Sequence, residues 1–227
     1  MSVHFEQELT ELKQALLRMA EQAESNVARA LQAMADRNDD LARQVKEDDN
    51  ILDEFEKTID DLAITLLAKA PLASQLRLIT VAMKASHDLE RVGDEATTIA
   101  RRALDLNVEA PLSIGVNLTQ MGHNGLMMLK EALGAFVNRD AAKARAIIPR
   151  DKQIDALNKQ LQRELALQMA QSPSTIRRCL NLMTISKSLE RIADHATNIA
   201  EEVVYLQEAV DIRHDPEIKR VKQPEPD

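Results

Sequence analysis

The sequence is poor in aromatic residues and has a single cysteine. Its 227 residues include no tryptophan, one tyrosine and three phenylalanines. Strand-rich domains usually draw on aromatic and β-branched residues, so a chain dominated by Ala, Leu, Met, Glu, Arg and Gln favours helix. Because Cys179 has no second cysteine to join, an intrachain disulfide and a cysteine-rich zinc site are excluded. We expect Cys179 to be a small core residue.

Long apolar runs and an excess of basic charge are also missing. No uninterrupted apolar stretch approaches the roughly 20 residues that span a bilayer, and the N-terminus has no basic region followed by an apolar segment. The net charge is -8, which argues against nucleic acid as the main partner, because phosphate backbones require a basic face. We therefore expect a cytoplasmic protein that reaches a membrane only through partners.

Apolar residues recur at spacings of three and four, which is typical of amphipathic helices. The segments that show this pattern are 9–34, 45–66, 76–89 with its continuation, and roughly 113–137, 140–170 and 174–208. Pro71, Pro111 and Pro173 separate these segments and predict loops, whereas Pro149 lies inside one and predicts a kink or a late helix start. The candidate N-cap residues are Asn38 or Asp39, Ser74, Ser113 and Ser174.

The chain contains an internal repeat. LERVGDEATTIA at 89–100 matches LERIADHATNIA at 189–200, and the pair Asp49 and Asp53 matches Asp151 and Asp155 at an offset of 102 residues. The repeating unit is three helices joined by short connections, so neighbouring helices should be antiparallel. We predict an all-α fold of six helices in two tandem-repeat antiparallel three-helix bundles, 1–108 and 109–210, followed by a polar, frayed tail, 211–227.

Each repeated motif carries two carboxylates on the apolar stripe of its helix. At about 100° per residue, Asp94 lies about 40° from Glu90 and close to the line of Ile79. Glu190 and Asp194 have the same relation in the second copy. Two buried carboxylates on one face repel each other and lose solvation, so they require a basic neighbour, protonation or a cation.

We therefore predict that Glu90, Asp94, Glu190 and Asp194 are metal ligands. Further candidate ligands are Asp49, Asp53, Asp151 and Asp155. They flank the core line of their helix and meet the motif only if the helix register allows it. Carboxylate oxygens suit hard cations. The residues therefore predict a divalent cation, with magnesium, calcium, manganese or iron as candidates, and no organic cofactor is expected.

The competing interpretation is an ion-pair network in which arginines neutralise these acids. The arginines concerned are Arg91, Arg101, Arg102 and Arg191. Arg91 and Arg191 directly follow their glutamates and lie about 100° round the helix, so they face a different neighbour. They are candidates for pairing across helices or for binding a partner.

Several catalytic patterns are missing from the sequence. It has no Glu-x-x-His pair, no HExxH, no P-loop and no EF-hand loop. The five histidines do not cluster, and His87 and His195 are expected to be surface or hydrogen-bonded residues rather than ligands. No nucleophile has an obvious base, so we do not expect an enzyme. The alternatives are a carboxylate–metal helical-bundle enzyme and a structural helical scaffold without metal.

The doubled motif resembles that of the PhoU family, the accessory proteins of bacterial phosphate-specific transport. That family carries two copies of an LERIGDHAxNIAE-like motif, one per three-helix bundle, and the resemblance covers roughly residues 5–208. The first copy departs from the pattern at Glu95, Thr98 and Arg101, and the second has Ala193 in place of the usual glycine. Arg101 brings a positive charge close to the first acidic pair, so the second copy is the more secure metal site.

The resemblance implies a function that spacing alone does not show. PhoU-like proteins bind the ATPase subunit of the phosphate ABC transporter and a phosphate sensor histidine kinase, and they keep the phosphate-starvation response off when phosphate is plentiful. Some bind multinuclear iron or other divalent metals at the acidic motifs, and they often form homodimers. We accordingly expect a negative regulator of phosphate uptake and of the Pho response.

Overall fold

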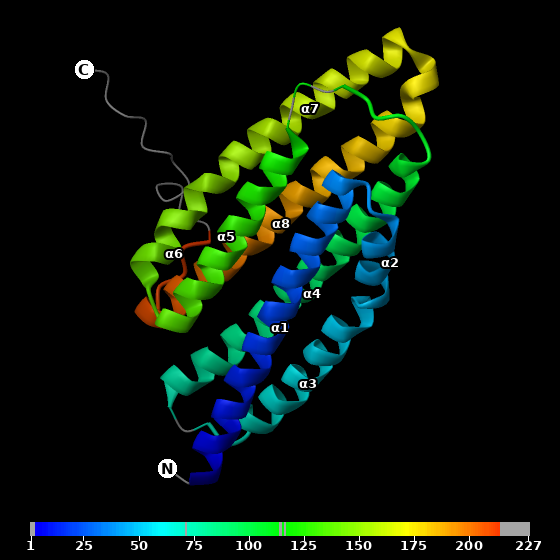
Figure 1. The fold of residues 1–227 in the computed structure, drawn as a ribbon. Coiled ribbons are helices and arrows are strands. Elements are labelled where there is room, and N and C mark those ends of the chain that lie inside the picture. The colour runs from blue at the N-terminus through cyan, green and yellow to red at the C-terminus, as the bar shows by residue number, and fades with distance from the viewer. Residues whose placement is uncertain (1–2, 71, 114, 116, 214–227) are drawn as a thin grey trace, which may run out of the picture.

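The computed structural model describes residues 3–70, 72–113, 115 and 117–213, and every regular element in this part of the chain is a helix (Figure 1). The helices, in chain order, are α1 (Val3–Asp36), α2 (Asp39–Glu47), α3 (Asp49–Leu67), α4 (Ala73–Asn107), α5 (Leu118–Asn138), α6 (Ala141–Ile147), α7 (Asp151–Gln171) and α8 (Ile176–Glu208). Two short 3₁₀ turns, Ile148–Arg150 and Pro173–Thr175, precede α7 and α8. The all-α prediction is confirmed.

The eight helices form six rods, because the second rod of each repeat is broken in two. The first repeat consists of α1, α2 with α3, and α4, and the second consists of α5, α6 with α7, and α8. The two motif helices, α4 and α8, make the most extensive contact of the fold, and α1 also packs against α5 (Figure 1). The tandem pair of three-helix bundles therefore meets along the helices that carry the repeated motif.

Both breaks occur immediately before an acidic residue. Between α2 and α3, Asp48 is the C-cap residue of α2 and forms a 2.7 Å ion pair with Arg29. Between α6 and α7, Pro149 lies in the 3₁₀ turn, as its missing N–H group predicted. Asp49 and Asp151 consequently stand in the first turn of α3 and α7, where the positive end of the helix dipole favours a carboxylate.

The helix starts are partly as predicted. Asn38 is confirmed as an N-cap, since its side chain accepts a hydrogen bond from the Leu41 N–H. The prediction of N-caps at Ser74, Ser113 and Ser174 is wrong. The N-cap residues of α4, α5 and α8 are Leu72, Asn117 and Thr175. Serine is a frequent N-cap. At α5, however, the side chain of Asn117 accepts the hydrogen bond from the Gln120 N–H, and at α8 a 3₁₀ turn that begins at Pro173 precedes the helix.

The core is built from aliphatic side chains and many alanines, which let the helices approach closely. Fully buried large residues include Leu12, Ile79, Leu129 and Ile147, and Cys179 is buried as expected. Pro111 lies in a loop, whereas Pro71 and the tail beyond 213 lie outside the described residues. The domain boundaries at 108 and 210 stay predictions.

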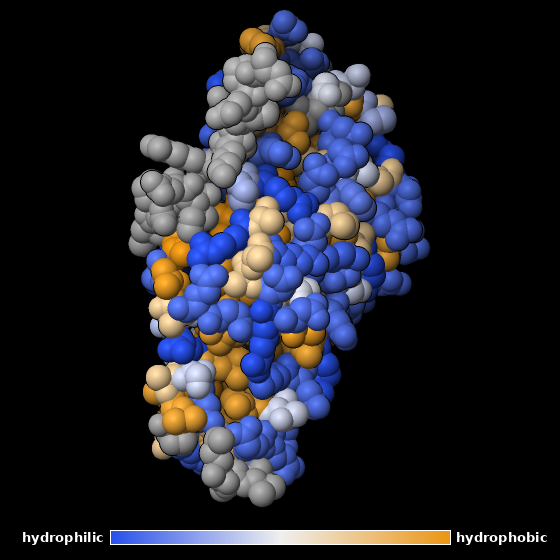
Figure 2. All heavy atoms as spheres, turned by 90° about the vertical axis from the view of Figure 1, so that its left-hand side faces the viewer, coloured by the Kyte–Doolittle hydropathy of each residue, from blue (hydrophilic) through white to orange (hydrophobic). Residues whose placement is uncertain are grey.

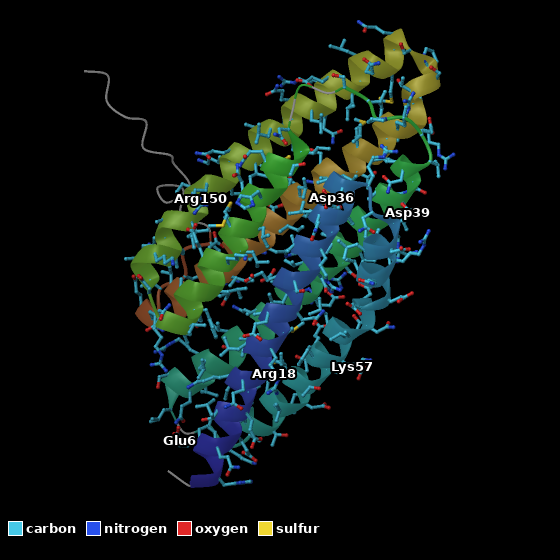
Figure 3. All side chains as sticks on the ribbon, viewed as in Figure 1. Glu6, Arg18, Asp36, Asp39, Lys57 and Arg150 are labelled. Carbon is cyan, nitrogen blue, oxygen red and sulfur yellow. The ribbon has the colours of Figure 1, made fainter. Side chains whose placement is uncertain are left out.

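The surface is strongly polar. Figure 2 shows hydrophilic residues over much of one face, with apolar side chains gathered mainly in its lower half. Charged side chains such as Asp39 and Lys57 point outward from their helices (Figure 3). Within the described part of the chain, none of the helices combines the length and the apolar character needed to cross a membrane.

Candidate metal centre

The register between α3 and α4 brings the two acidic pairs of the first repeat together. Gly93 permits this close approach, because a Cβ atom there would lie 2.2 Å from Cδ1 of Leu52, a side chain that is 1% exposed. Leu52 lies between Asp49 and Asp53 in the chain, and Gly93 directly precedes Asp94. The packing therefore decides what the sequence left open, that the acids of α3 face those of α4.

In the first repeat, Glu90 is mostly buried and Asp94 is half-buried, with side chains that are 11% and 45% exposed. Both carboxylates form ion pairs with Arg91, whose Nε lies 3.0 Å from Glu90 and whose Nη1 lies 3.0 Å from Asp94. Burial raises the pKa of Asp94, and the charges of Asp49 and Asp53 raise it further against the opposing effect of Arg91. The pKa of Glu90 is raised mainly by burial and by Asp94.

The prediction that the acids continue a buried stripe is only partly correct. Leu76 and Ile176, at the start of the two stripes, are 40% and 42% exposed. The acidic ends lie at the edge of the core instead. Glu190 is buried, whereas Asp94 and Asp194 are half-buried and border solvent-accessible pockets.

In the second repeat, Asp194 meets Asp151 and Asp155, and one carboxylate oxygen of each lies within 4.8 Å of the other two. Burial raises the pKa of Asp194, and the charges of Glu190 and Asp155 raise it further. Glu190 forms an ion pair with Lys187 one turn away on α8. Asp151 and Asp155 thus join Asp194 in one group of possible ligands, and Glu190 is not part of that group.

Two of these aspartates, Asp151 and Asp194, line a small pocket of about 120 Å³, together with Lys152, Thr197 and Glu201 among others. Thr197 is 9% exposed, and its hydroxyl oxygen has no hydrogen-bond partner among the residues that the structure describes. A divalent cation prefers several hard oxygen donors, including carboxylates and water. The donor set and the unused hydroxyl of this pocket therefore fit a cation, whether bound directly or through its water shell.

A second group of three ligand atoms lies in the first repeat. Oxygens of Glu56 and Glu90 and a ring nitrogen of His87 fall within 4.8 Å of one another, and Nδ1 of His87 lies 3.2 Å from Glu56. Sequence reasoning missed Glu56, whereas His87 is confirmed as a surface, hydrogen-bonded residue, since its side chain is 61% exposed. The i to i+3 spacing of His87 and Glu90 was the available signal, but the partner on α3 depends on tertiary packing.

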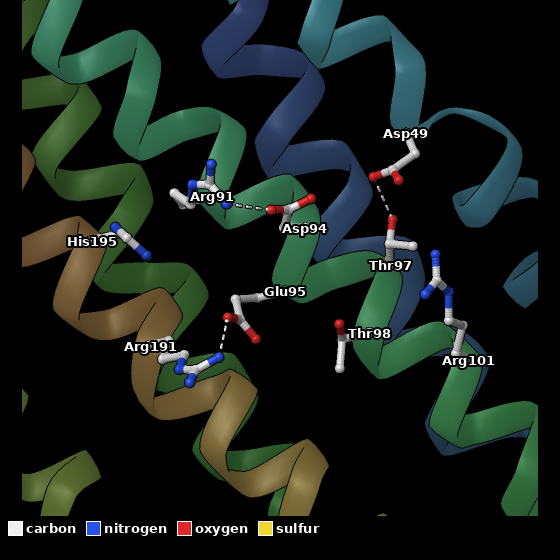
Figure 4. Close-up of a pocket in the computed structure, with 9 residues that line it drawn as sticks. All are labelled: Asp49, Arg91, Asp94, Glu95, Thr97, Thr98, Arg101, Arg191 and His195. Atoms are coloured by element: carbon white, nitrogen blue, oxygen red, sulfur yellow. Dashed lines mark hydrogen bonds and ion pairs between the residues drawn. The ribbon is translucent and has the colours of Figure 1, made fainter.

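A larger pocket, of about 470 Å³, lies between the repeats (Figure 4). Its lining residues are Asp49, Arg91, Asp94, Glu95, Thr97, Thr98, Arg101, Arg191 and His195. Arg191 reaches across from α8 to Glu95 of α4 at 3.0 Å, whereas Arg91 stays on its own helix. Arg102 pairs with Asp105 on the same helix. The arginines proposed as partner-binding residues thus make internal ion pairs at the rim of this pocket.

A polar contact that the sequence did not indicate joins α4 to α8. Asp88 is 9% exposed and accepts hydrogen bonds from Asn198 at 3.0 Å and from Nδ1 of His195 at 2.8 Å, the ring nitrogen carrying its proton in that arrangement. Lys84 of α4 pairs with the buried Glu202 of α8 at 2.9 Å. These contacts join the two repeats, and they give His195 a hydrogen-bonding partner on α4.

Comparison with known proteins assigns a family to this architecture. The family model for the PhoU domain matches twice, at residues 16–103 and 118–203. A Pseudomonas aeruginosa protein named as a phosphate-specific transport system accessory protein PhoU homolog is 41% identical over 94% of this chain and 89% of its own length. A Rhizobium meliloti protein of the same name is 38% identical over 89% of this chain and 86% of its own.

Two solved structures have the same fold. The crystal structure of PhoU from Pseudomonas aeruginosa superposes with a TM-score of 0.88 at 40% identity, covering 91% of this chain and all of that one. The phosphate transport system regulatory protein PhoU from Streptococcus pneumoniae superposes with a TM-score of 0.84 at 32% identity, covering 91% of this chain and 98% of that one.

Proposed function

The chain belongs to the PhoU family, and from that premise we propose that it is an accessory protein that regulates phosphate-specific transport. The observation that carries this proposal is the similarity to relatives of that name over nearly the whole chain, both repeats included. The non-enzymatic part of the proposal is supported by the name of these relatives, which describes an accessory protein. The chain's one cysteine, Cys179, is buried, and its thiol lies 3.6 Å from the hydroxyl of Thr175.

In more detail, we propose a cytoplasmic negative regulator of phosphate uptake and of the phosphate-starvation response. It would act as an adaptor between the ATPase subunit of the phosphate ABC transporter and a sensor histidine kinase, and it would work as a homodimer. The polar surface and the extensive contact of α4 with α8 suit a protein whose two ends contact different partners. Arg91 and Arg191, at the rim of the larger pocket, are candidates for such a contact.

The metal part of the proposal concerns the acidic motifs. Asp151, Asp155 and Asp194 would hold a divalent cation, with iron, manganese, magnesium or zinc as the metals to test. When bound, the cation supplies positive charge that offsets the repulsion among the three carboxylates. The chain's own part is to hold α7 against α8, so that acids from two helices point into one pocket. We expect the bound cation to stabilise the packing of α7 against α8 in the second bundle.

The regulatory role is tested by deleting the gene. Alkaline phosphatase is expected to be derepressed in high phosphate, and the intact gene supplied in trans should restore repression. Unchanged repression in the deletion strain would contradict the regulatory role. Co-purification with the transporter ATPase and with the sensor kinase, at high and at low phosphate, tests the adaptor role, and the absence of both partners under both conditions would exclude it.

A structural scaffold without metal is the second candidate, and one observation favours it. Glu90 and Glu190 both form ion pairs with basic residues of their own helix, Arg91 and Lys187. Elemental analysis of protein purified without chelator separates the two candidates. Bound metal that is lost on Asp194→Asn substitution supports the metal centre, and metal-free protein supports the scaffold. The remaining alternative, a metal-dependent enzyme, requires turnover of oxygen or peroxide by metal-loaded protein.

A further inference from the structure

An apolar groove lies where the ends of α5 and α8 meet α1 and the start of α4. Its volume is about 230 Å³, and its lining includes Lys13, Leu78, Phe136, Val137, Arg139 and Leu206. Val137 is 54% exposed. The left-hand side of Figure 1 carries these helix ends, and apolar side chains gather in the lower half of the same face in Figure 2. The described residues thus leave an apolar surface open between the two repeats.

The groove has an equivalent in the first repeat. Three of its residues have counterparts at the offset of 102 residues, namely Phe136 with Met34, Val137 with Ala35 and Arg139 with Arg37. All three counterparts line one pocket of about 640 Å³, together with Leu106, the equivalent of Leu206. Arg37 and Arg139 also share a left-handed backbone, with φ of 52° and 54°. The two pockets are therefore the same position in the two copies of the repeat.

In the first repeat, the chain itself occupies this position. The linker that follows α4 runs past the pocket, and its residues Ala110, Pro111 and Leu112 form part of the wall. Nη2 of Arg37 donates hydrogen bonds to the carbonyl oxygens of Leu106 at 3.1 Å and of Glu109 at 2.6 Å. This position thus holds a short non-helical segment through aliphatic side chains and main-chain carbonyl groups.

In the second repeat, the equivalent position has no such segment among the described residues. None of residues 209–213, which follow α8, lines the groove. Neither Lys13 nor Arg139 has an ion-pair or side-chain hydrogen-bond partner in the described part of the chain. The carboxylate of Asp140, next to Arg139, accepts a 2.9 Å hydrogen bond from the Lys143 N–H. Exposed apolar surface bordered by two uncompensated cations favours a partner with aliphatic and acidic side chains.

We propose that this groove binds a short non-helical segment of another protein, one that carries proline or leucine next to a carboxylate. The groove holds it in the way that the first repeat holds its own linker. Aliphatic side chains of the segment contact Phe136 and Val137, Arg139 donates hydrogen bonds to its carbonyl oxygens, and its carboxylate faces Lys13. The inference goes beyond the proposed function and depends neither on a metal nor on the identity of the regulatory partners.

The test uses the linker as its probe. A fluorescein-labelled peptide with the sequence of residues 106–113, LNVEAPLS, is titrated with the full-length chain, and fluorescence anisotropy should show saturable binding. Val137→Asp in the chain, or Leu112→Asp in the peptide, should weaken binding at least about tenfold, because each places a charge in the apolar contact. Val108→Asp in the chain is the matched control, since Val108 is 70% exposed and lines neither pocket.

Arg139→Gly separates binding from folding. Glycine adopts the left-handed backbone of this position without strain, so the variant keeps the turn but loses the guanidinium group. It should bind the peptide more weakly while its melting temperature is unchanged or raised. Added salt should weaken binding to the native chain, and it should do so less in Lys13→Gln, which has one charge fewer beside the groove.

Four results would overturn the proposal. The first is the absence of saturable binding up to about 1 mM peptide. The second is native affinity in Val137→Asp, which places the peptide elsewhere. The third is at least tenfold tighter binding by a chain that ends at Arg213, which would make residues 214–227 of this chain the occupant. The fourth is a dimer of the native chain that dissociates in Val137→Asp, which would make a second copy the occupant.

Discussion

The substitution Asp194→Asn is expected to change stability in opposite directions with and without metal. Asparagine keeps the size of the side chain but removes a charge that faces Asp151 and Asp155. In the metal-free protein this removal relieves repulsion, so the variant should be more stable than the native chain. When a cation is bound, the same carboxylate is a ligand, so the variant should be less stable.

The size of the first effect follows from the distance between the carboxylates. Unit charges 4.8 Å apart repel by about 0.9 kcal/mol in water and by about 3.5 kcal/mol at an effective dielectric constant of 20. Asp194 is half-buried, so solvent screening places the gain near the lower figure, about 1 kcal/mol. For a chain of this length, 1 kcal/mol corresponds to roughly 2–4 °C in melting temperature.

The size of the second effect follows from binding linkage. A ligand present at 100 times its dissociation constant stabilises the native state by about 2.7 kcal/mol, which the native chain gains and the variant largely loses. The net result with metal is a variant that is less stable by roughly 2 kcal/mol. The variant should therefore melt at a higher temperature than the native chain in chelator-treated protein, and at a lower temperature than the native chain once Mn²⁺ is added.

The pH dependence of the metal-free protein has a definite sign. The folded-state pKa of Asp194 is raised by burial and by its acidic neighbours, so its contribution to stability is fully present below the unfolded-state pKa. That contribution is lost as the pH rises through the raised folded value. Asp194→Asn should flatten this part of the stability profile.

Differential scanning calorimetry at matched pH, with chelator and then with excess Mn²⁺, measures both effects. Asp94→Asn is the control, because it keeps the pocket of the second repeat and should retain the full Mn²⁺-dependent rise in melting temperature. If Asp194→Asn gains as much from Mn²⁺ as the native chain, the cation does not bind at this carboxylate. If the metal-free variant melts below the native chain, the repulsion argument is wrong.

Three further predictions concern packing and surface charge. Gly93→Ala should destabilise the protein by about 1–2 kcal/mol in urea unfolding despite the better helix propensity of alanine, because its Cβ meets Leu52; a more stable variant would refute this. Arg139 ends α5 with φ 54°, so Arg139→Gly should add about 0.5–1 kcal/mol of stability, and a loss would show that the side chain itself matters. Lys69→Gln should let the lowered pKa of Glu8 rise toward its ordinary value in an NMR titration.

Much of the fold was predictable because its signals are local in sequence. Apolar spacing predicted the six rods, and Pro149 marked the break before α7. The helix starts were less predictable, because Ser113 and Ser174 are as good N-caps in isolation as Asn117 and Thr175. Tertiary packing and the 3₁₀ turn at Pro173 decide which residue begins each helix.

The candidate site was predictable only in part. The repeat placed Glu90, Asp94, Glu190 and Asp194 at equivalent motif positions. It gave no means of ranking them, and the structure groups Asp194 with the acids of α7 while Glu190 pairs with Lys187. The partners of His195 and Arg191 lie on α4, about 100 residues away in the chain, and spacing within one helix carries no information about them.

The sequence by itself determined an all-helical chain, a twofold repeat and acids at matching positions, because helix formation and periodicity depend on neighbours three and four residues apart. Only the tertiary structure decided which acids meet. That outcome depends on the register of antiparallel helices, which close packing such as Leu52 against Gly93 sets. It also decided that Thr97 is satisfied by Asp49 whereas Thr197 keeps an unused hydroxyl, so that two similar motifs form pockets of different chemistry.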